Sequence, residues 1–234
     1  MAFVLIAASA NINLNCNYMK QIFLLGLLTC GLVMSGMAQQ NDPKAKTILD
    51  GVSKKFKSLS SIVASFTLKV EGTNNKVADS KKGVMSMKGN KYRIVMDGQE
   101  IISDNKTSWT YSKDNNEVTV NGVDQSAGSL TPAKLFTNFY DKDYLYRLND
   151  ETREGARTLQ NIEMTPTDKS KPTFKVLLSV DKKTQTIYRV KMFNKDGNRY
   201  TYEITGFTPN KLLADNLFMF DAKQHPGVEV VDLR

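Results

Sequence analysis

The sequence predicts a mainly β fold, with helices added, in which about 11 short strands form a barrel or a strongly curved sheet. Two observations support this. From Ile62 onward apolar and polar residues alternate with a period of two, in short runs that end at turn residues. Two other segments space their apolar residues three and four positions apart, as on one face of a helix.

The first 38 residues are predicted to be a leader. After Met19, a lysine precedes an apolar run over 22–33, and small residues follow at Gly36 and Ala38, which is the order of a secretory signal peptide. The run is shorter than the roughly 20 residues of a membrane-spanning helix. The prediction divides the chain into a mis-assigned extension over 1–18, a signal peptide over 19–38 and a single domain over 39–234.

An alternative processing route would acylate Cys30 and tether the protein to a membrane. Thr29 precedes this cysteine where Gly, Ala or Ser is usual, and the apolar run continues past it, so cleavage after Ala38 is favoured. Both cysteines, Cys16 and Cys30, then lie in the leader. The mature chain is therefore predicted to contain no disulfide, thiolate nucleophile or thiolate metal site.

The mature chain is predicted to open with a helix. Asp42 is placed to cap it, and Pro43 suits its first position. Its apolar residues form one stripe opposite a lysine-rich face: Ala45, Ile48, Leu49, Val52 and Phe56. We expect this stripe to lie on an apolar surface.

Two blocks of predicted strands follow. The first block has six runs: SIVASFTLKV, GVMSMK, KYRIVMD, QEIISD, TSWTYS and NEVTVN. The second has five: DYLYRLN, ARTLQNIEMT, TFKVLLSV, QTIYRVKMFN and NRYTYEITGF. Turn residues between the runs are typical of consecutive antiparallel hairpins. The chain closes with an apolar tail, VEVV, as a candidate to dock on the domain.

A short helix is predicted between the two blocks, in GSLTPAKLFTNFY. Thr131 is its expected cap and Pro132 its first residue. Leu135, Phe136 and Phe139 then give it an apolar side. Such a helix can cover one opening of a curved sheet, as can the first helix.

Catalytic chemistry has few candidate residues in this chain. The sole histidine, His225, precedes a proline and is expected to be a solvated loop residue. No nucleophile elbow, phosphate-binding loop or dinucleotide-binding glycine triplet is present, and no carboxylate pair stands out. No cofactor or metal is therefore expected, and a small-molecule hydrolase that uses carboxylates is a distant alternative.

The mature chain is basic, with 31 lysines and arginines and 24 acidic residues once Lys20 is removed, a net charge of about +7. An anionic membrane surface or an acidic partner is one explanation. Solubility is the favoured one, because the lysines are scattered along the sequence. Nucleic acid is not expected, since no nucleic-acid-binding module is recognisable.

Neighbouring strands carry more apolar side chains than one covered sheet face requires: Met85, Met87, Tyr92, Ile94, Val95 and Met96. Flexible methionine side chains suit a pocket for varied apolar ligands. A core filled on both faces of the sheet explains the pattern equally well.

Four segments, in this order, resemble the LolA family of periplasmic lipoprotein carriers: SIVASFTLKV, ISDNKTSWTY, LTPAKLF and LFMFDAKQHPGVEVVD. The resemblance spans nearly all of the mature chain. It implies an incomplete antiparallel β-barrel of about 11 strands, strongly curved, with helices forming a lid over an apolar cavity.

The same resemblance implies a function. A periplasmic monomer of this kind binds the acyl chains of lipoproteins, accepts them from an inner-membrane ATP-driven (ABC) transporter and passes them to the outer membrane, directly or through an acceptor there. It is not an enzyme. A related alternative is a lipid or lipoprotein sensor of the same fold that acts in envelope-stress regulation.

The alternation and the resemblance together predict the binding residues. The expected cavity wall consists of Phe66, Leu68, Met85, Met87, Ile94, Trp109 and Tyr111. The expected lid residues are Leu135, Phe136 and Phe139.

This chain departs from the family pattern in two places. An arginine that fastens the lid in the family is missing after Lys88, where the nearest arginine is Arg93. The turn of the tryptophan segment reads DNK instead of aspartate, glycine, lysine, so Asn105 is expected to adopt the left-handed conformation.

Overall fold

The computed structural model describes residues 41–74, 76–123 and 140–234. These residues lie within one compact unit, Asn41–Arg234. No helix in these described ranges is both long and apolar enough to span a bilayer. The predictions that fall outside the described residues concern the extension 1–18, the signal peptide 19–38, Cys30, and the lid residues Leu135, Phe136 and Phe139.

Helix α2 (Pro43–Lys57) confirms the predicted first element. The Asp42 carboxylate accepts hydrogen bonds from the Lys44 N–H at 2.8 Å and from the Leu148 N–H at 2.9 Å. The first bond caps the helix, and the second ties its start to strand β7 (Tyr144–Glu154). The predicted apolar stripe is buried, with Ile48 only partly so.

Loss of this cap has a pH-dependent expected cost. Both bonds lower the pKa of Asp42, so its stabilisation is present above the unfolded pKa of about 3.9 and disappears as pH falls through the lower folded pKa. Asp42→Ala should lower the free energy of unfolding by about 1 kcal/mol at pH 7, and the difference from wild type should shrink near pH 2. Urea titrations at both pH values measure it.

Asp42→Asn is the matched control, because the amide oxygen accepts hydrogen bonds without titrating. It should cost less than Asp42→Ala at pH 7. Because neither variant titrates at this position, the difference between the two variants should be the same at both pH values, while the difference of each from wild type shrinks near pH 2. An Asp42→Ala cost that stays constant from pH 7 to pH 2 would contradict the role given to the carboxylate.

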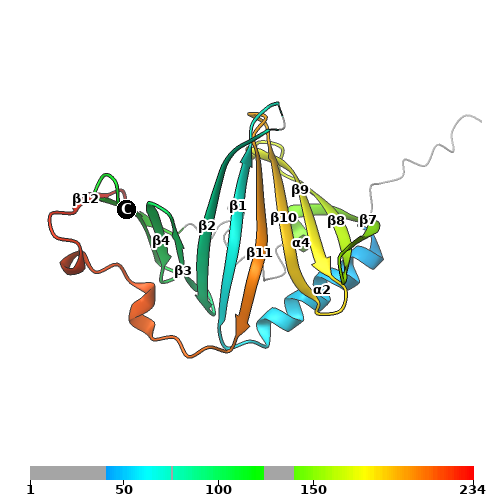
Figure 1. The fold of residues 1–234 in the computed structure, drawn as a ribbon, viewed down its shortest axis with the longest axis horizontal. Helices are drawn as coiled ribbons and strands as arrows, with labels where there is room; N and C mark the ends of the chain where they lie inside the picture. Colours follow the sequence, from blue (N-terminus) through cyan, green and yellow to red (C-terminus); the bar gives the residue numbers. More distant parts are fainter. Residues whose placement is uncertain (1–40, 75, 124–139) are drawn as a thin grey trace, which may run out of the picture. The chain divides into compact units, whose positions relative to one another are not determined.

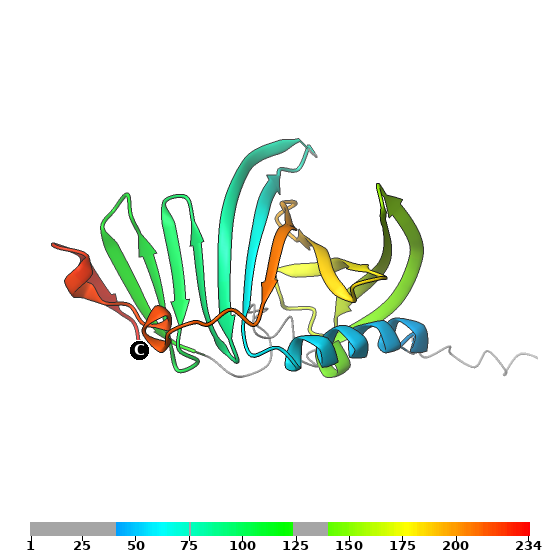
Figure 2. The same ribbon diagram turned by 60° about the horizontal axis from the view of Figure 1, so that its bottom comes forward.

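The strands form a single open sheet in the order β12-β6-β5-β4-β3-β2-β1-β11-β10-β9-β8-β7 (Figures 1 and 2). The first six are β1 (Ile62–Glu71), β2 (Val77–Lys88), β3 (Lys91–Met96), β4 (Gln99–Ser103), β5 (Thr107–Ser112) and β6 (Glu117–Gly122). The short helix α4 (Tyr140–Asp143) precedes β7, and the remaining strands are β8 (Arg157–Pro166), β9 (Thr173–Asp181), β10 (Thr186–Asn194), β11 (Arg199–Pro209) and β12 (Glu229–Asp232).

All 11 predicted strands are confirmed, and every pairing among them is antiparallel. The two predicted blocks are joined by β1, which pairs with β2 on one side and with β11 on the other. The apolar tail supplies a twelfth strand, β12, which pairs in parallel with β6. Asn105 has φ 79°, as expected for its turn.

We call the side of the sheet that packs with α2 the helix face. Its core joins the α2 stripe to alternate strand residues, beginning with Ile62, Ala64, Phe66 and Leu68 of β1. Directly opposed residues in neighbouring strands share a face, so the pairing register extends this assignment across the sheet.

The opposite side, which we call the outer face, carries a second apolar layer beneath the C-terminal segment, residues 210–234. This segment leaves β11, forms the 3₁₀ turns η1 (Asp215–Phe218) and η2 (Ala222–Gln224), and ends in β12 (Figure 1). Phe218, Ile102 and Val118 are each at most 1% exposed. The segment is therefore part of the fold.

Candidate functional site

Five of the predicted wall residues share the helix face: Phe66, Leu68, Met85, Met87 and Ile94. The register aligns Met85 of β2 with Ala64 of β1 and with Ile94 of β3. Successive opposed residues form a continuous apolar row across β4, β3, β2, β1 and β11: Ile101, Ile94, Met85, Ala64 and Phe207. A second row crosses the other half of the sheet: Leu68, Tyr202, Val190, Leu178, Ile162 and Leu148.

Burial along these rows is uneven. On β8 and β9 the helix-face residues are closed off, with Ile162 at 0% and Leu178 at 3% exposed. Around β3, β4, β10 and β11 they are only partly buried: Ile94, Met96, Ile101, Met192, Tyr200, Tyr202, Ile204 and Phe207. Apolar surface thus continues beyond the tightly packed core, as a site for an apolar ligand requires.

Gly83 allows the Phe66 ring to lie across β2. The two residues are paired in the register, and a Cβ at Gly83 would clash with the Phe66 ring and with Met96. Phe66 also packs against Tyr202, with ring centroids 6.0 Å apart. The glycine in this strand therefore serves side-chain packing on the helix face.

Buried tyrosines keep this face uncharged. Desolvation raises the pKa of Tyr92 and of Tyr202, because burial disfavours the phenolate. Burial raises the pKa of Tyr140 as well, and its hydroxyl donates a hydrogen bond to Asp50 of α2 at 2.6 Å. The hydroxyls stay neutral at physiological pH, so the face presents apolar and weakly polar groups.

Trp109 and Tyr111 lie on the outer face, which corrects the prediction that they share a wall with the other five residues. Ile94 of β3 is opposed by Ile101 of β4, which is opposed in turn by Thr110 of β5. Thr110 therefore lies on the helix face, and its neighbours Trp109 and Tyr111 point to the other face. Alternation within β5 correctly placed the two aromatics together. It could not assign their face, which depends on register across three strands.

Tyr111 packs under the C-terminal segment. Its ring lies 5.5 Å from that of Phe220 and 4.3 Å from that of His225, and its hydroxyl donates to Asn116 at 3.0 Å. His225 is a loop residue, as expected, but it is partly buried and stacks on Phe220 with centroids 4.7 Å apart. This aromatic group packs the C-terminal segment against β5.

Arg93 also lies on the outer face. Its guanidinium forms an ion pair with Glu100 of β4 and donates to the carbonyl of Leu217 at 3.4 Å. Lys113 stands 3.6 Å from the same carboxylate. Arg93 therefore holds the C-terminal segment, a role that sequence reasoning missed because the partners are 7 and 124 residues away.

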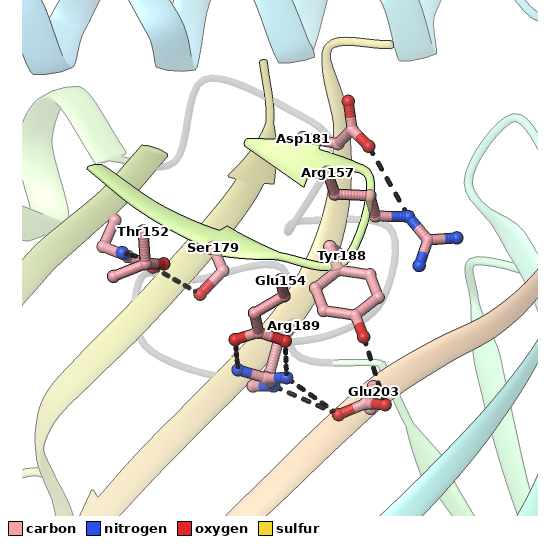
Figure 3. A network of polar contacts seen from close by, with 9 residues as sticks. Thr152, Glu154, Arg157, Ser179, Asp181, Tyr188, Arg189 and Glu203 are labelled. Atoms are coloured by element: carbon pink, nitrogen blue, oxygen red, sulfur yellow. Dashed lines mark hydrogen bonds and ion pairs between the residues drawn. The ribbon is translucent and has the colours of Figure 1, made fainter. Parts of the chain in front are cut away.

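The polar network in Figure 3 is also on the outer face. Arg189 of β10 donates to both carboxylate oxygens of Glu154, at 2.9 and 2.8 Å, and to Glu203 of β11 at 3.0 Å. These carboxylates raise the pKa of Arg189, while Arg189 lowers that of Glu154. Mutual pairing of this kind braces neighbouring strands.

Within the described ranges, no group of three or more histidine, cysteine, aspartate or glutamate residues is arranged to hold a metal ion. The arrangement that stands out is the partly covered apolar area of the helix face. Chemically, such a surface can hold hydrocarbon chains.

Comparison with known proteins bears on what this surface binds. The family model described as outer membrane lipoprotein carrier protein LolA matches residues 57–221. Two curated proteins named outer-membrane lipoprotein carrier protein, from Cupriavidus taiwanensis and Cupriavidus necator, are each 31% identical to the chain. Their matches cover 158 and 159 residues, which is 65% of this chain and 72% of each relative.

A solved structure shares the fold. An uncharacterized conserved protein from Thermus thermophilus superposes with a TM-score of 0.55, covering 81% of this chain and 99% of that one. The two sequences are 13% identical, so the likeness concerns the fold alone.

Proposed function

Because the chain belongs to the LolA family of outer membrane lipoprotein carrier proteins, we propose that its helix face binds the acyl chains of lipoproteins and carries them between membranes. The observation that supports this most directly is the continuous apolar row from Ile101 to Phe207, which is only partly covered. Phe66, Leu68, Met85, Met87 and Ile94 are the proposed wall.

The proposal extends to the route. The protein is exported by cleavage of residues 19–38, works as a periplasmic monomer over 39–234, takes its cargo from an inner-membrane ATP-driven transporter and delivers it to the outer membrane. The proposed lid residues are Leu135, Phe136 and Phe139. No catalytic step is needed, since carriage changes no covalent bond.

Release limits how tightly a carrier can bind. An acyl chain of about 15 methylenes gains roughly 12 kcal/mol on burial, at about 0.8 kcal/mol per methylene. A closed and perfectly complementary cavity would retain such a chain. Met85, Met87, Met96 and Met192 on the helix face supply flexible side chains that adapt to a ligand without enclosing it rigidly.

Depletion of the protein tests carriage in the cell. Triacylated lipoproteins should then accumulate at the inner membrane, and protein purified from undepleted cells should carry such lipoproteins by native mass spectrometry. Unchanged delivery on depletion would overturn the proposal. Recovery of free lipid alone would also overturn it and point to the sensor alternative.

A fluorescence experiment tests which face receives the acyl chains. Trp109 is the sole tryptophan and lies on the outer face, so a triacylated lipopeptide with brominated acyl chains should leave its emission nearly unchanged. The matched variant combines Trp109→Phe with Tyr202→Trp and moves the reporter to the helix face. The same lipopeptide should quench it strongly, because bromine quenches an indole in contact with it.

The opposite result, quenching of Trp109 but not of the relocated indole, would place the cargo on the outer face. Equal quenching of both would indicate binding that is not confined to either face. Both outcomes contradict the proposed wall.

A further inference from the structure

Three hairpin connections meet at one end of the sheet, where β1 leads to β2, β8 to β9 and β10 to β11 (Figure 1). The Lys195 N–H donates to the Pro172 carbonyl at 2.9 Å, which joins two of the connections. Gly197 lies so close to Thr73 that a Cβ there would clash, which joins the third. We call these residues, 69–74, 76–82, 167–175 and 191–199, the loop end.

The loop end holds most of the net charge of the chain. Its 31 residues include ten lysines and arginines but four acidic residues, a net charge of +6. The formal charge of all 234 residues is +8. Lysines that are scattered in the sequence are thus collected by the hairpins into one basic surface.

Most of these cations form no ion pair with a described carboxylate. Among the described residues, Lys191 pairs with Glu71 at 2.8 Å and Lys81 with Asp79 at 3.7 Å. The other eight have no carboxylate oxygen within 4 Å in the part of the chain that the structure describes. Their charge is available to a partner.

One aromatic residue of the loop end contacts three of its cations. The Phe193 ring has Lys175 Nζ 4.5 Å, Arg199 Cζ 5.4 Å and Lys191 Nζ 5.7 Å from its centroid. The register accounts for the cluster, because Phe193 opposes Lys175 on one side and Arg199 on the other. Three cations are therefore held side by side on the outer face.

Apolar side chains project from the same end. Phe174 is 48% exposed and Val77 is 56% exposed. Phe174 also contacts Phe193, with ring centroids 6.3 Å apart. Exposed apolar residues among unpaired cations are typical of surfaces that rest on the headgroup region of a membrane.

We propose that the loop end docks on the surface of an anionic lipid bilayer. Lysines and arginines approach the lipid phosphates, while Phe174 and Val77 enter the interface. An acidic protein would satisfy the charges but would give no role to the exposed apolar side chains at the starts of β2 and β9. The inference concerns a membrane-contact surface outside the proposed acyl-chain site and does not depend on cargo.

The test is flotation of the purified protein with vesicles of phosphatidylethanolamine, with and without 30% phosphatidylglycerol. Binding should require the anionic lipid and should fall when salt is raised from about 0.05 to 0.5 M, since salt screens such contacts. The key variant combines Lys175→Gln, Lys195→Gln and Arg199→Gln. At about fivefold per cation near the surface, it should weaken partitioning roughly 100-fold.

A charge-matched control removes three exposed lysines elsewhere, with Lys44→Gln, Lys54→Gln and Lys183→Gln. It should bind vesicles within about threefold of wild type, because cations outside the contact contribute little beyond the Debye length. Equal losses in the two triple variants would overturn the proposal, since net charge alone would then explain binding.

A second pair of variants covers the case in which the triple variant does not fold. Phe174→Ser should weaken vesicle binding several-fold, whereas Leu212→Ser, at a site 98% exposed and away from the loop end, should not.

Binding to vesicles without phosphatidylglycerol that equals binding with it would overturn the proposal. So would retention on polyglutamate with no flotation, which would identify an acidic protein partner. No cargo is present, so failure here leaves the carrier proposal untouched.

Discussion

Ile94→Asp is expected to weaken binding of a triacylated lipopeptide by roughly 100-fold, equivalent to about 2.7 kcal/mol. Ile94 is partly buried in the apolar row of the helix face, beside Met85 and Ile101. A carboxylate at this point must lose water or take up a proton when an acyl chain covers it, and either event opposes binding.

Val95→Asp is the control, because Val95 is the next residue of β3 and points to the outer face. It introduces the same charge into the same strand at similar burial and should change lipopeptide affinity by less than about threefold. Urea unfolding of both variants shows whether each is folded in the binding assay.

If Ile94→Asp does not fold, the milder variant Ile94→Asn replaces it, with Val95→Asn as its control. Equal losses of affinity in both members of a pair would remove the distinction between the faces.

Arg93→Ala is expected to lower the free energy of unfolding by about 3 kcal/mol. The change removes the ion pair with Glu100, whose side chain is 10% exposed, and leaves that carboxylate with Lys113 at 3.6 Å. It also removes a hydrogen bond to the Leu217 carbonyl, which anchors the C-terminal segment. Urea unfolding followed by circular dichroism gives the size of the effect.

The double variant Arg93→Met with Glu100→Met distinguishes the contribution of the ion pair to stability from that of side-chain packing around it. With both charges gone and similar volume retained, much of the lost stability should return, because no unpaired carboxylate stays buried. Lipopeptide affinity should stay close to that of wild type, since both residues lie away from the helix face. A loss below about 0.5 kcal/mol in Arg93→Ala would show that the pair is solvated and adds little.

Local patterns predicted the elements well. The helix cap at Asp42, the 11 antiparallel strands and the left-handed Asn105 each depend on residues a few positions apart. Five of the predicted wall residues share one face because alternation was applied to β1, β2 and β3, which are consecutive hairpin neighbours. Whether they bind acyl chains remains a prediction.

The errors came from distant contacts. The C-terminal segment returns to cover Tyr111 with Phe220 and His225, more than 100 residues later in the chain. No local sequence pattern indicates which face of the sheet the C-terminal segment covers. The basic loop end was missed for the same reason, because its lysines become neighbours only when three hairpins align.

The pairing of β1 with β11 also has a consequence for how the molecule assembles. Leu68 meets Tyr202 across this seam, a separation of 134 residues. Hairpins within each block can form early and locally, whereas a seam of such long range forms late, because the chain must first close a large loop. The proposed acyl-chain surface crosses that seam, so it reaches its full width only when folding is nearly finished. On this proposal, the continuous surface for acyl chains exists only in the completed molecule.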